Sequence, residues 1–353
     1  MRAALYYKAL DLRIEDIPAP HGDLGSDEVL VRNKACGICG TDLHEYFDGP
    51  IYSPQDPHPV TNIQLPVIPG HEFAGVVEAV GRDVSTVVPG DRVSIMPQIY
   101  CGRCAQCVAG RQQTCLNLAA VGFSAAWGGL AELGVFKDYQ VFRIPDSMSY
   151  MEGALIEPTA VAVHAVNMGS VQPGDTVLIS GGGPIGQLAA MAAAAFGAGQ
   201  VILSEPNERR RARAGDLGLT RVVDPITEDL KAVVGELTDG NGADVCIECS
   251  GGQAALTDCL NNVRIGGTIV QTALGTRPVL IDTSAQLTLR DVTYKGAYCY
   301  PVTSWPRVIQ LVASGKIPAA KIVTETLDLT DLTKGFDALA DPAGDQLKVI
   351  IQL

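Results

Sequence analysis

The sequence lacks the long apolar run that a membrane-spanning helix requires. Its Ala-rich stretch at 188–195 is much shorter than the ~20 apolar residues of a span, and Gly197 and Gly199 follow it closely. The N-terminal residues also lack the extended apolar region and cleavage site of a secretory signal peptide. We therefore expect a cytoplasmic protein with no membrane partner.

Positive charge is scarce as well. The chain has 26 Lys and Arg against 39 Asp and Glu, which gives a formal net charge of −13. A nucleic-acid-binding surface requires clustered basic side chains, and the chain has one such cluster, at 209–213. This cluster could be a solvated helix face or could contact a cofactor phosphate. We expect no nucleic-acid partner.

The composition that is present favours a folded protein of about two domains. The 353 residues are 47% hydrophobic, which allows a large core and argues against disorder. The 10 cysteines are too few for a disulfide scaffold in a chain of this length. In a reducing compartment, clustered cysteines are more often metal ligands.

The first ~150 residues are rich in short predicted strands separated by Gly and Pro, which indicates a partly open β-barrel with long loops. The proline-rich segment 46–65 has no helical period, and we interpret it as a loop inserted near the site. The predicted strands are Ala3–Tyr7, Leu12–Ile17, Glu28–Ala35 and Phe73–Val80, with another strand within 87–94.

Strands and helices alternate after about residue 154, which predicts a parallel sheet covered on both faces. The predicted strands are Thr176–Ser180, Gln200–Ser204, Arg221–Val223 and Ala243–Cys249. The intervening helices are Gly186–Phe196, Glu208–Leu217 and Ile226–Leu237. Because Leu347–Leu353 resembles a closing strand, we assign 1–155 and 297–353 to the first domain and 156–296 to the second.

A glycine-rich turn follows the first predicted strand of the second domain and opens a helix, the context that a dinucleotide-binding motif requires. Its glycines allow a tight turn and a close approach to the pyrophosphate, and the helix start presents free N–H groups. An acidic residue ending the next strand would bind the adenosine ribose and repel a 2′-phosphate, which favours NAD over NADP unless an arginine of the basic cluster reaches the ribose. The residues assigned to the cofactor are Gly181, Gly183, Pro184, Ile185, Gly186, Glu205 and Arg210.

Four closely spaced cysteines form the strongest local signal. Cys101, Cys104, Cys107 and Cys115 can surround one tetrahedral ion, and four sulfur ligands leave no open position. We therefore predict a structural zinc here. The alternative is two disulfides or unliganded thiols, which a cytosolic location disfavours.

A second metal site, with an open position, is predicted from Cys39, His71 and Glu157, which are zinc-ligand types far apart in the sequence. Cys36 lies three residues before Cys39, so the two could bind one metal ion together, but the turn between them does not force both side chains to face the same ion. For three residues close to these ligands in the sequence, a purely structural role is an alternative to a role in the site. Thr41 could cap a helix that begins at Asp42, His44 could be a solvated helix residue, and Glu72 could bind a backbone or arginine group.

These motifs occur together in one known family. The chain resembles the zinc-dependent medium-chain alcohol dehydrogenases over its whole length. Glu157, where the classical enzymes carry cysteine, is similar to the polyol dehydrogenase branch, and the loop from Tyr46 to His71 looks most like the 2,3-butanediol dehydrogenases. The matching elements are Gly37–His44, Gly70–Gly75, the four-cysteine segment, Glu157-Pro158 and the glycine-rich turn.

The resemblance implies an α/β fold, in which a Rossmann doubly wound parallel sheet accompanies a GroES-like partly open β-barrel. It implies one catalytic and one structural zinc, NAD as cofactor, and a homodimer or homotetramer. It further implies that Thr41 accepts the alcohol proton and passes it toward His44, and that Asp42 orients His71. Glu72 is an alternative to Glu157 as the third ligand of the catalytic zinc.

The first functional hypothesis is oxidation of a small secondary alcohol or vicinal diol, with a pocket lined by aromatics such as Tyr46, Phe123 and Trp127. The second keeps the enzyme class and changes the substrate to a sorbitol-like polyol or to threonine. The third is a non-enzymatic dinucleotide-binding protein, which would be expected to lose Cys39, Thr41 or His71. All three residues are present, which disfavours this third hypothesis.

Overall fold

The computed structural model describes residues 1–20, 24–275, 277–341 and 344–353, and it divides into two compact units. The first unit contains Met1–Glu157, Pro301–Ala313 and Val323–Leu353, and the second contains Pro158–Tyr300 and Ser314–Ile322. Residues 314–322 therefore group with the second unit, although they lie within the segment assigned above to the first domain. In the described part of the chain, no helix combines the length and hydropathy needed to cross a bilayer.

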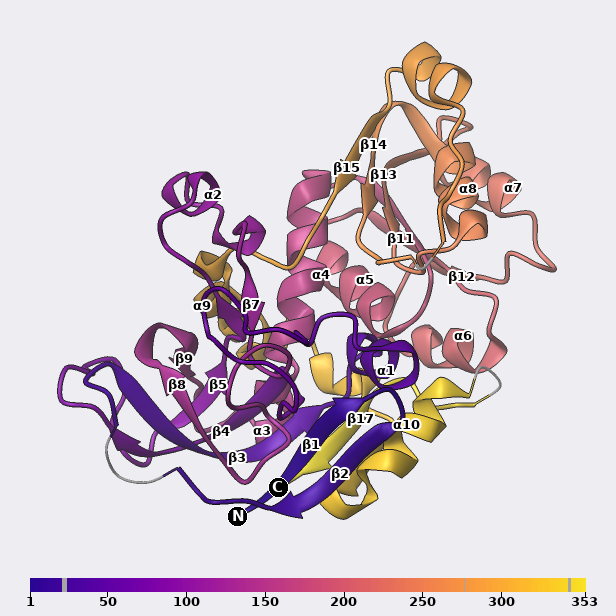
Figure 1. Cartoon of the computed structure of the whole chain (residues 1–353). Coiled ribbons are helices and arrows are strands. Elements are labelled where there is room, and N and C mark those ends of the chain that lie inside the picture. The colour runs from indigo at the N-terminus through magenta and orange to yellow at the C-terminus, as the bar shows by residue number, and fades with distance from the viewer. Residues whose placement is uncertain (21–23, 276, 342–343) are drawn as a thin grey trace. The chain divides into compact units, whose positions relative to one another are not determined.

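The first unit is built on a seven-stranded sheet with the order β16-β17-β3-β4-β5-β9, in which β8 also pairs with β3 (Figure 1). The pairing is antiparallel except between β16 and β17. The predicted C-terminal strand is confirmed as β17. The strands are β3 (Glu28–Gly37), β4 (Glu72–Val80), β5 (Arg92–Ile95), β8 (Leu133–Lys137), β9 (Val141–Arg143), β16 (Glu325–Asp328) and β17 (Val349–Gln352).

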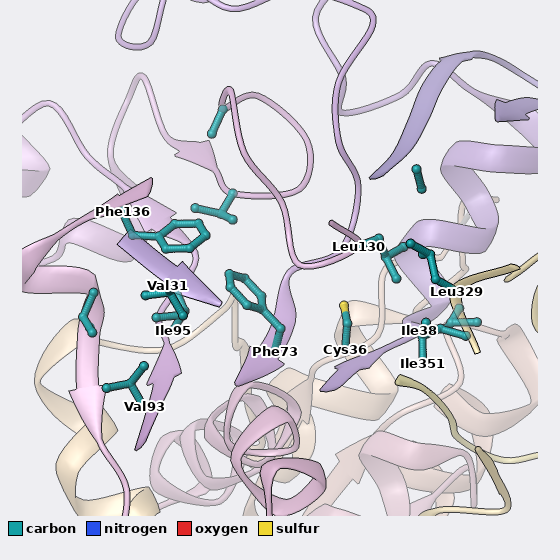
Figure 2. Packing of buried hydrophobic residues seen from close by; sticks show 14 of the residues in the cluster. Val31, Cys36, Ile38, Phe73, Val93, Ile95, Leu130, Phe136, Leu329 and Ile351 are labelled. Atoms are coloured by element: carbon teal, nitrogen blue, oxygen red, sulfur yellow. The ribbon is translucent and has the colours of Figure 1, made fainter. Parts of the chain in front are cut away.

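Buried and partly buried positions alternate along most of β3, because successive side chains of a strand point to opposite faces of the sheet. Val31 of β3 and Phe73 of β4 are fully buried and belong to one hydrophobic cluster with Phe136 (Figure 2). The Phe73 and Phe136 ring centroids lie 5.2 Å apart. Burying a side chain of this size stabilises the fold by about 1.5–3 kcal/mol.

The remaining elements of the first unit include two small antiparallel ribbons, β1-β2 and β6-β7. The four strands are β1 (Arg2–Lys8), β2 (Asp11–Asp16), β6 (Gln98–Ile99) and β7 (Ala119–Ala120). The helices are α1 (Gly40–Asp48), α2 (Ala105–Val108), α3 (Tyr150–Ala154), α9 (Trp305–Ala313) and α10 (Leu332–Ala340).

The second unit contains a six-stranded parallel sheet with the order β12-β11-β10-β13-β14-β15 (Figure 1). Its strands are β10 (Thr176–Ser180), β11 (Gln200–Ser204), β12 (Arg221–Val223), β13 (Ala243–Glu248), β14 (Val263–Gln271) and β15 (Thr293–Gly296). Its helices are α5 (Pro184–Ala195), α6 (Glu208–Gly215), α7 (Leu230–Leu237) and α8 (Gln253–Asn262), and α4 (Ile156–Gly169) begins at the end of the first unit.

Helices cover both faces of this sheet. Leu178 of β10 packs in one cluster with residues of α7 and α8. Its neighbour Ile179 must point the other way, and it lies on the side of Gly186 in α5. The prediction of a doubly wound parallel sheet is therefore confirmed.

Helix α7 begins later than predicted. The Asp229 side chain accepts hydrogen bonds from the N–H groups of Lys231 and Ala232, so the helix begins at Leu230. The preceding residues form a turn around Asp224, whose Oδ1 accepts from Ile226 N at 3.0 Å. Apolar periodicity placed Ile226 in the helix, but this turn leaves Ile226 76% exposed.

Candidate active site

Cys39 occupies the N-cap of α1, directly after β3. Asp42 in the first turn of the helix accepts a hydrogen bond from Cys39 N through Oδ2 at 2.9 Å. Helix α1 therefore begins before Thr41, and the reading of Thr41 as the capping residue is wrong. Thr41 instead places its Oγ1 3.7 Å from Cys39 Sγ.

Asp42 also fixes His71. Its Oδ1 lies 3.3 Å from His71 Nδ1, and both side chains are buried. Burial lowers the pKa of the His71 imidazole, but the negative charges of Asp42 and Cys39 and the hydrogen bonds to them raise that pKa well above its ordinary value. The surroundings of His71 therefore stabilise positive charge.

Glu72 follows His71 at the start of β4 and completes a cluster. The ligand atoms of Cys39, His71 and Glu72 all lie within 4.8 Å of one another. Glu72 can turn toward the cluster because it is paired with Gly37 of β3. A Cβ atom at residue 37 would collide with Glu72 Oε2.

Lys348, just before β17, binds the same carboxylate. Its Nζ lies 2.7 Å from Glu72 Oε1 and 2.5 Å from Oε2, and it donates to Ile38 O at 3.0 Å. Burial lowers the pKa of Lys348, but the charges of Glu72, Cys39 and Glu157 raise it above its ordinary value. Lys348 is a site residue that the sequence analysis missed. The sequence did contain a hint, since a lysine stands directly before the run Val-Ile-Ile. A lysine that points inward from such a strand requires an acidic partner.

Glu157 lies in the first turn of α4 and is 8% exposed. Its charge contributes to the raised pKa of Lys348, which places it in the electrostatic environment of the cluster. Among the described residues, however, the group whose ligand atoms lie within 4.8 Å contains Glu72 and not Glu157. Cys36 is also outside this group and is fully buried.

The donor set fits a divalent cation of the zinc type. Thiolate, imidazole and carboxylate are the groups that zinc binds, and three protein ligands leave one position for water or substrate. One thiolate and one carboxylate would offset the charge of the ion, and the carboxylate of Glu72 would then be shared between the ion and Lys348. The negative charges that raise the pKa values of His71 and Lys348 would also attract a cation, which would have to displace the proton of His71 in order to bind it.

Aromatic rings extend outward from His71. The Phe123 ring centroid lies 4.8 Å from that of His71, and the Tyr52 ring lies 5.8 Å from Phe123. Of the other two residues predicted to line the pocket, Tyr46 borders a small cavity together with Asp42 and Phe123. Tyr46 contacts Phe336 with a centroid distance of 5.1 Å, and Trp127 packs beside a cluster that includes Ile68. The His44 side chain is 47% exposed, with Nδ1 3.8 Å from Asp48 Oδ2.

The four cysteines predicted to bind a structural ion lie together around α2. The ligand atoms of Cys101, Cys104, Cys107 and Cys115 are within 4.8 Å of one another. Backbone N–H groups at Leu116 and Cys107 lower the pKa of the Cys104 thiol to about 6, which favours the thiolate that metals bind. All four are free cysteines in the structure, an arrangement that fits a closed tetrahedral site.

The predicted glycine-rich turn joins β10 to α5. Gly181 has a φ of +102°, a conformation that favours glycine, and a Cβ at Gly186 would collide with Gly181 O. Pro184 is the first residue of α5, as its fixed φ and missing N–H allow. The N-terminal N–H groups of this 12-residue helix are suited to phosphate binding.

Glu205 lies against the turn. Its Oε2 accepts from Gly182 N at 2.6 Å and its Oε1 from Asn207 N at 2.7 Å, and the residue is 4% exposed. Gln187 donates to Gly182 O at 3.0 Å and to Arg210 O at 3.3 Å, which ties the start of α6 to the turn. Within the basic cluster, Arg211 pairs with Asp224 at 2.9 Å.

Two family models match this chain. Residues 25–146 match the alcohol dehydrogenase GroES-like domain, and residues 184–314 match the zinc-binding dehydrogenase domain. The chain belongs to the zinc-binding alcohol dehydrogenase family. Its fold is accordingly a GroES-like domain with a Rossmann-like domain, and its class is oxidoreductase.

Similar members of the family differ in their substrates. The chain is 36% identical over 355 residues to (R,R)-butanediol dehydrogenase of Bacillus subtilis (strain 168), with 100% of this chain and 99% of the relative covered. It is 33% identical over 351 residues to sorbitol dehydrogenase of the same strain, with 99% and 97% covered. The crystal structure of 2R,3R-butanediol dehydrogenase from Bacillus subtilis matches with a TM-score of 0.91 and 34% identity, covering 100% and 99%. These identities alone do not distinguish a diol from a longer polyol.

Proposed function

We propose that this zinc-binding dehydrogenase oxidises a small secondary alcohol or vicinal diol with NAD, converting 2,3-butanediol to acetoin, and catalyses the reverse reduction. In the forward direction the diol loses a hydride to NAD and a proton to solvent, so that acetoin, NADH and H⁺ form. The observation that carries the proposal is the cluster of Cys39, His71 and Glu72 beside Thr41 and Asp42.

Cys39 and His71 are the proposed protein ligands of a catalytic zinc, with a carboxylate as the third. Glu72 is favoured by its position, and Glu157 is the alternative. When bound, zinc polarises the alcohol oxygen and lowers the pKa of the hydroxyl, and NAD accepts the hydride. Asp42 holds Nδ1 of His71, which leaves Nε2 for the metal.

Thr41 is the proposed acceptor of the substrate proton. Its hydroxyl lies beside Cys39 Sγ and can donate its own proton as it accepts another. His44, which lies on the same helix and is about half exposed, is the proposed exit toward solvent. The four-cysteine group is proposed to hold a structural zinc.

NAD is proposed as the preferred cofactor because Glu205 places a carboxylate at the glycine-rich turn. A negative charge there repels a 2′-phosphate and accepts hydrogen bonds from ribose hydroxyls. Gly181, Gly183, Pro184, Ile185 and Gly186 would approach the pyrophosphate. Arg210 is a proposed cofactor contact, and an Arg210 side chain at the ribose would weaken the preference for NAD.

The diol is favoured over other substrates by the aromatic surroundings of His71. Phe123 and Tyr52 supply mostly apolar ring surface and one phenol hydroxyl, whereas a six-carbon polyol would require several polar groups. Sorbitol-like polyols are the second candidate because a sorbitol dehydrogenase is nearly as similar to this chain as a butanediol dehydrogenase. Threonine is the third, and a pocket for it would require a group that binds the substrate carboxylate.

The function is tested by NADH formation with (R,R)-, (S,S)- and meso-2,3-butanediol, sorbitol and threonine, before and after metal chelation. We expect activity on a butanediol, loss of activity on chelation, and loss of turnover in Cys39→Ser. Equal kcat/KM for sorbitol and butanediol would reject the diol assignment. Full activity after verified metal removal would reject the zinc mechanism.

A homodimer or homotetramer in the cytoplasm is proposed as the working form. Strand β15 ends the described sheet of the second unit, and Leu280 and Leu289 nearby in the sequence are each 81% exposed. An open strand edge with exposed apolar side chains can pair with a second copy. A monomer in analytical ultracentrifugation would reject this part of the proposal.

A further inference from the structure

The loop that follows α1 is held in place by one buried carboxylate. Glu45 is 4% exposed, and its Oε2 accepts from Ile51 N at 3.0 Å and from Tyr52 N at 2.8 Å. Its Oε1 accepts from Ser53 N at 2.8 Å. Three consecutive backbone N–H groups therefore converge on one side chain.

This arrangement supplies acceptors for the N–H groups of residues 51–53. The described residues 49–65 contain no helix or strand, so their buried N–H groups require other acceptors. A charged acceptor strengthens each hydrogen bond, and the donors in turn compensate the burial of the carboxylate. The Glu45 main chain is fixed as well, because its carbonyl accepts from Tyr6 Oη at 2.6 Å and from Gly49 N at 3.1 Å.

Fixing the loop also fixes the main chain of Tyr52, whose ring contacts Phe123. Its ring lies 5.8 Å from that of Phe123 at an interplanar angle of 58°, and Phe123 lies 4.8 Å from the ring of His71. Phe123 is 7% exposed and Tyr52 is 40% exposed. The two rings thus run from His71 to the protein surface.

One small cavity adjoins the Phe123 ring. A cavity of about 10 Å³ is lined by Asp42, Glu45, Ser53 and Phe123, among other residues. That volume holds at most one water molecule and cannot accept a displaced ring. While the Glu45 hydrogen bonds persist, the Phe123 ring cannot withdraw into this cavity.

We propose that Glu45 is a positioning residue that holds Tyr52 against Phe123, and that the resulting wall limits the length of the alcohol that reaches Cys39 and His71. A four-carbon diol presents methyl groups that can contact the rings. A six-carbon polyol would extend along them and lose water from several hydroxyls, of which the single phenol hydroxyl of Tyr52 could bind at most one or two. This inference rests on the proposed function and adds to it a selection of alcohol substrates by the length of their carbon chain.

The test uses the full-length zinc-loaded enzyme and the ratio of kcat/KM for 2,3-butanediol to kcat/KM for sorbitol. Tyr52→Ala should lower this ratio at least about fivefold by opening the wall, a change of about 1 kcal/mol in relative barrier. Glu45→Gln, which keeps the shape of the side chain but places an NH₂ group among N–H donors, should lower it in the same direction. Tyr52→Phe retains the ring and should leave the ratio within twofold.

Hydrogen exchange of peptides that cover residues 50–53 tests the hydrogen bonds independently of substrate. We expect exchange in Glu45→Gln to be at least about tenfold faster there, since bonds to a charged acceptor are lost. Glu152→Gln is the matched control, because Glu152 also binds a backbone N–H, that of Ser149, but lies in α3. Its exchange in this loop and its substrate ratio should equal those of the wild type.

Three results would overturn the proposal or separate it from the proposed function. Unchanged exchange at 50–53 in Glu45→Gln would refute the positioning role. An unchanged ratio in Tyr52→Ala would refute the wall, and because Tyr52 is partly exposed this variant should fold even if Glu45→Gln does not. A wild type that oxidises only threonine would reject the proposed function and with it the length selection, while the exchange result would still decide the role of Glu45.

Discussion

Replacing Lys348 by methionine removes the cation that compensates Glu72. The pair is buried, with Lys348 2% and Glu72 0% exposed, and Nζ lies 2.7 Å from Oε1. Coulomb's law at this distance and an effective dielectric constant of ~20 gives an attraction of about 6 kcal/mol. Methionine avoids the cost of desolvating the ammonium, so we expect a net loss of about 3–5 kcal/mol in the free energy of unfolding.

Tryptophan fluorescence during urea unfolding is a suitable assay. The chain has 2 tryptophans, and both Trp127 and Trp305 belong to the first unit, so the signal reports the unit that contains the pair. The loss should appear in chelator-treated protein. Saturating zinc should reduce it, because the ion supplies positive charge next to Glu72.

The double variant Glu72→Gln/Lys348→Met is the control for this reasoning. It no longer carries an uncompensated carboxylate, so it should be more stable than Lys348→Met alone by about 2 kcal/mol or more. A loss below ~1 kcal/mol in Lys348→Met, or a double variant less stable than the single one, would refute the argument that the pair is a tightly coupled buried unit.

Two further predictions concern the second unit. Glu205→Ala should raise the ratio of kcat/KM for NADP to that for NAD at least about tenfold, or ~1.4 kcal/mol, because it removes the carboxylate proposed to bind the ribose; an unchanged ratio in steady-state kinetics would reject that role. Burial lowers the pKa of His164, which is 8% exposed, below its ordinary value. The unfolded chain therefore binds the proton more readily, and stability should fall as pH drops from about 6.5 through the lower folded pKa. Urea titrations at pH 7 and pH 5 should show a smaller pH-dependent loss in His164→Gln than in the wild type, and equal losses would contradict the assignment.

Much of the second unit was predictable because its determinants are local. The strands 176–180 and 200–204 are short apolar runs bounded by glycine or proline, and their predicted limits agree with β10 and β11. The start of α7 was not predictable from apolar periodicity, because Asp224 and Asp229 form local side-chain hydrogen bonds that compete with the helix.

The site was only partly predictable. Ligand types and family resemblance predicted Cys39 and His71 as ligands, and the structure brings their ligand atoms together with that of Glu72. The role of Lys348 depends on a contact with Glu72 across 276 positions of the sequence, and spacing does not reveal that contact. The Glu45 interaction was hidden for another reason. A glutamate on an amphipathic helix is usually solvated, and only the path of the following loop buries it.

Zinc content is the most direct test of the claim that distant side chains form an open metal site. Mass spectrometry of the metals in purified protein should give two zinc ions per wild-type chain. Cys39→Ala should retain one and lose turnover, whereas Cys104→Ala should lose the other ion through a separate group of ligands. Two ions in Cys39→Ala, or full activity of a wild type that holds zinc only at the four cysteines, would contradict the account.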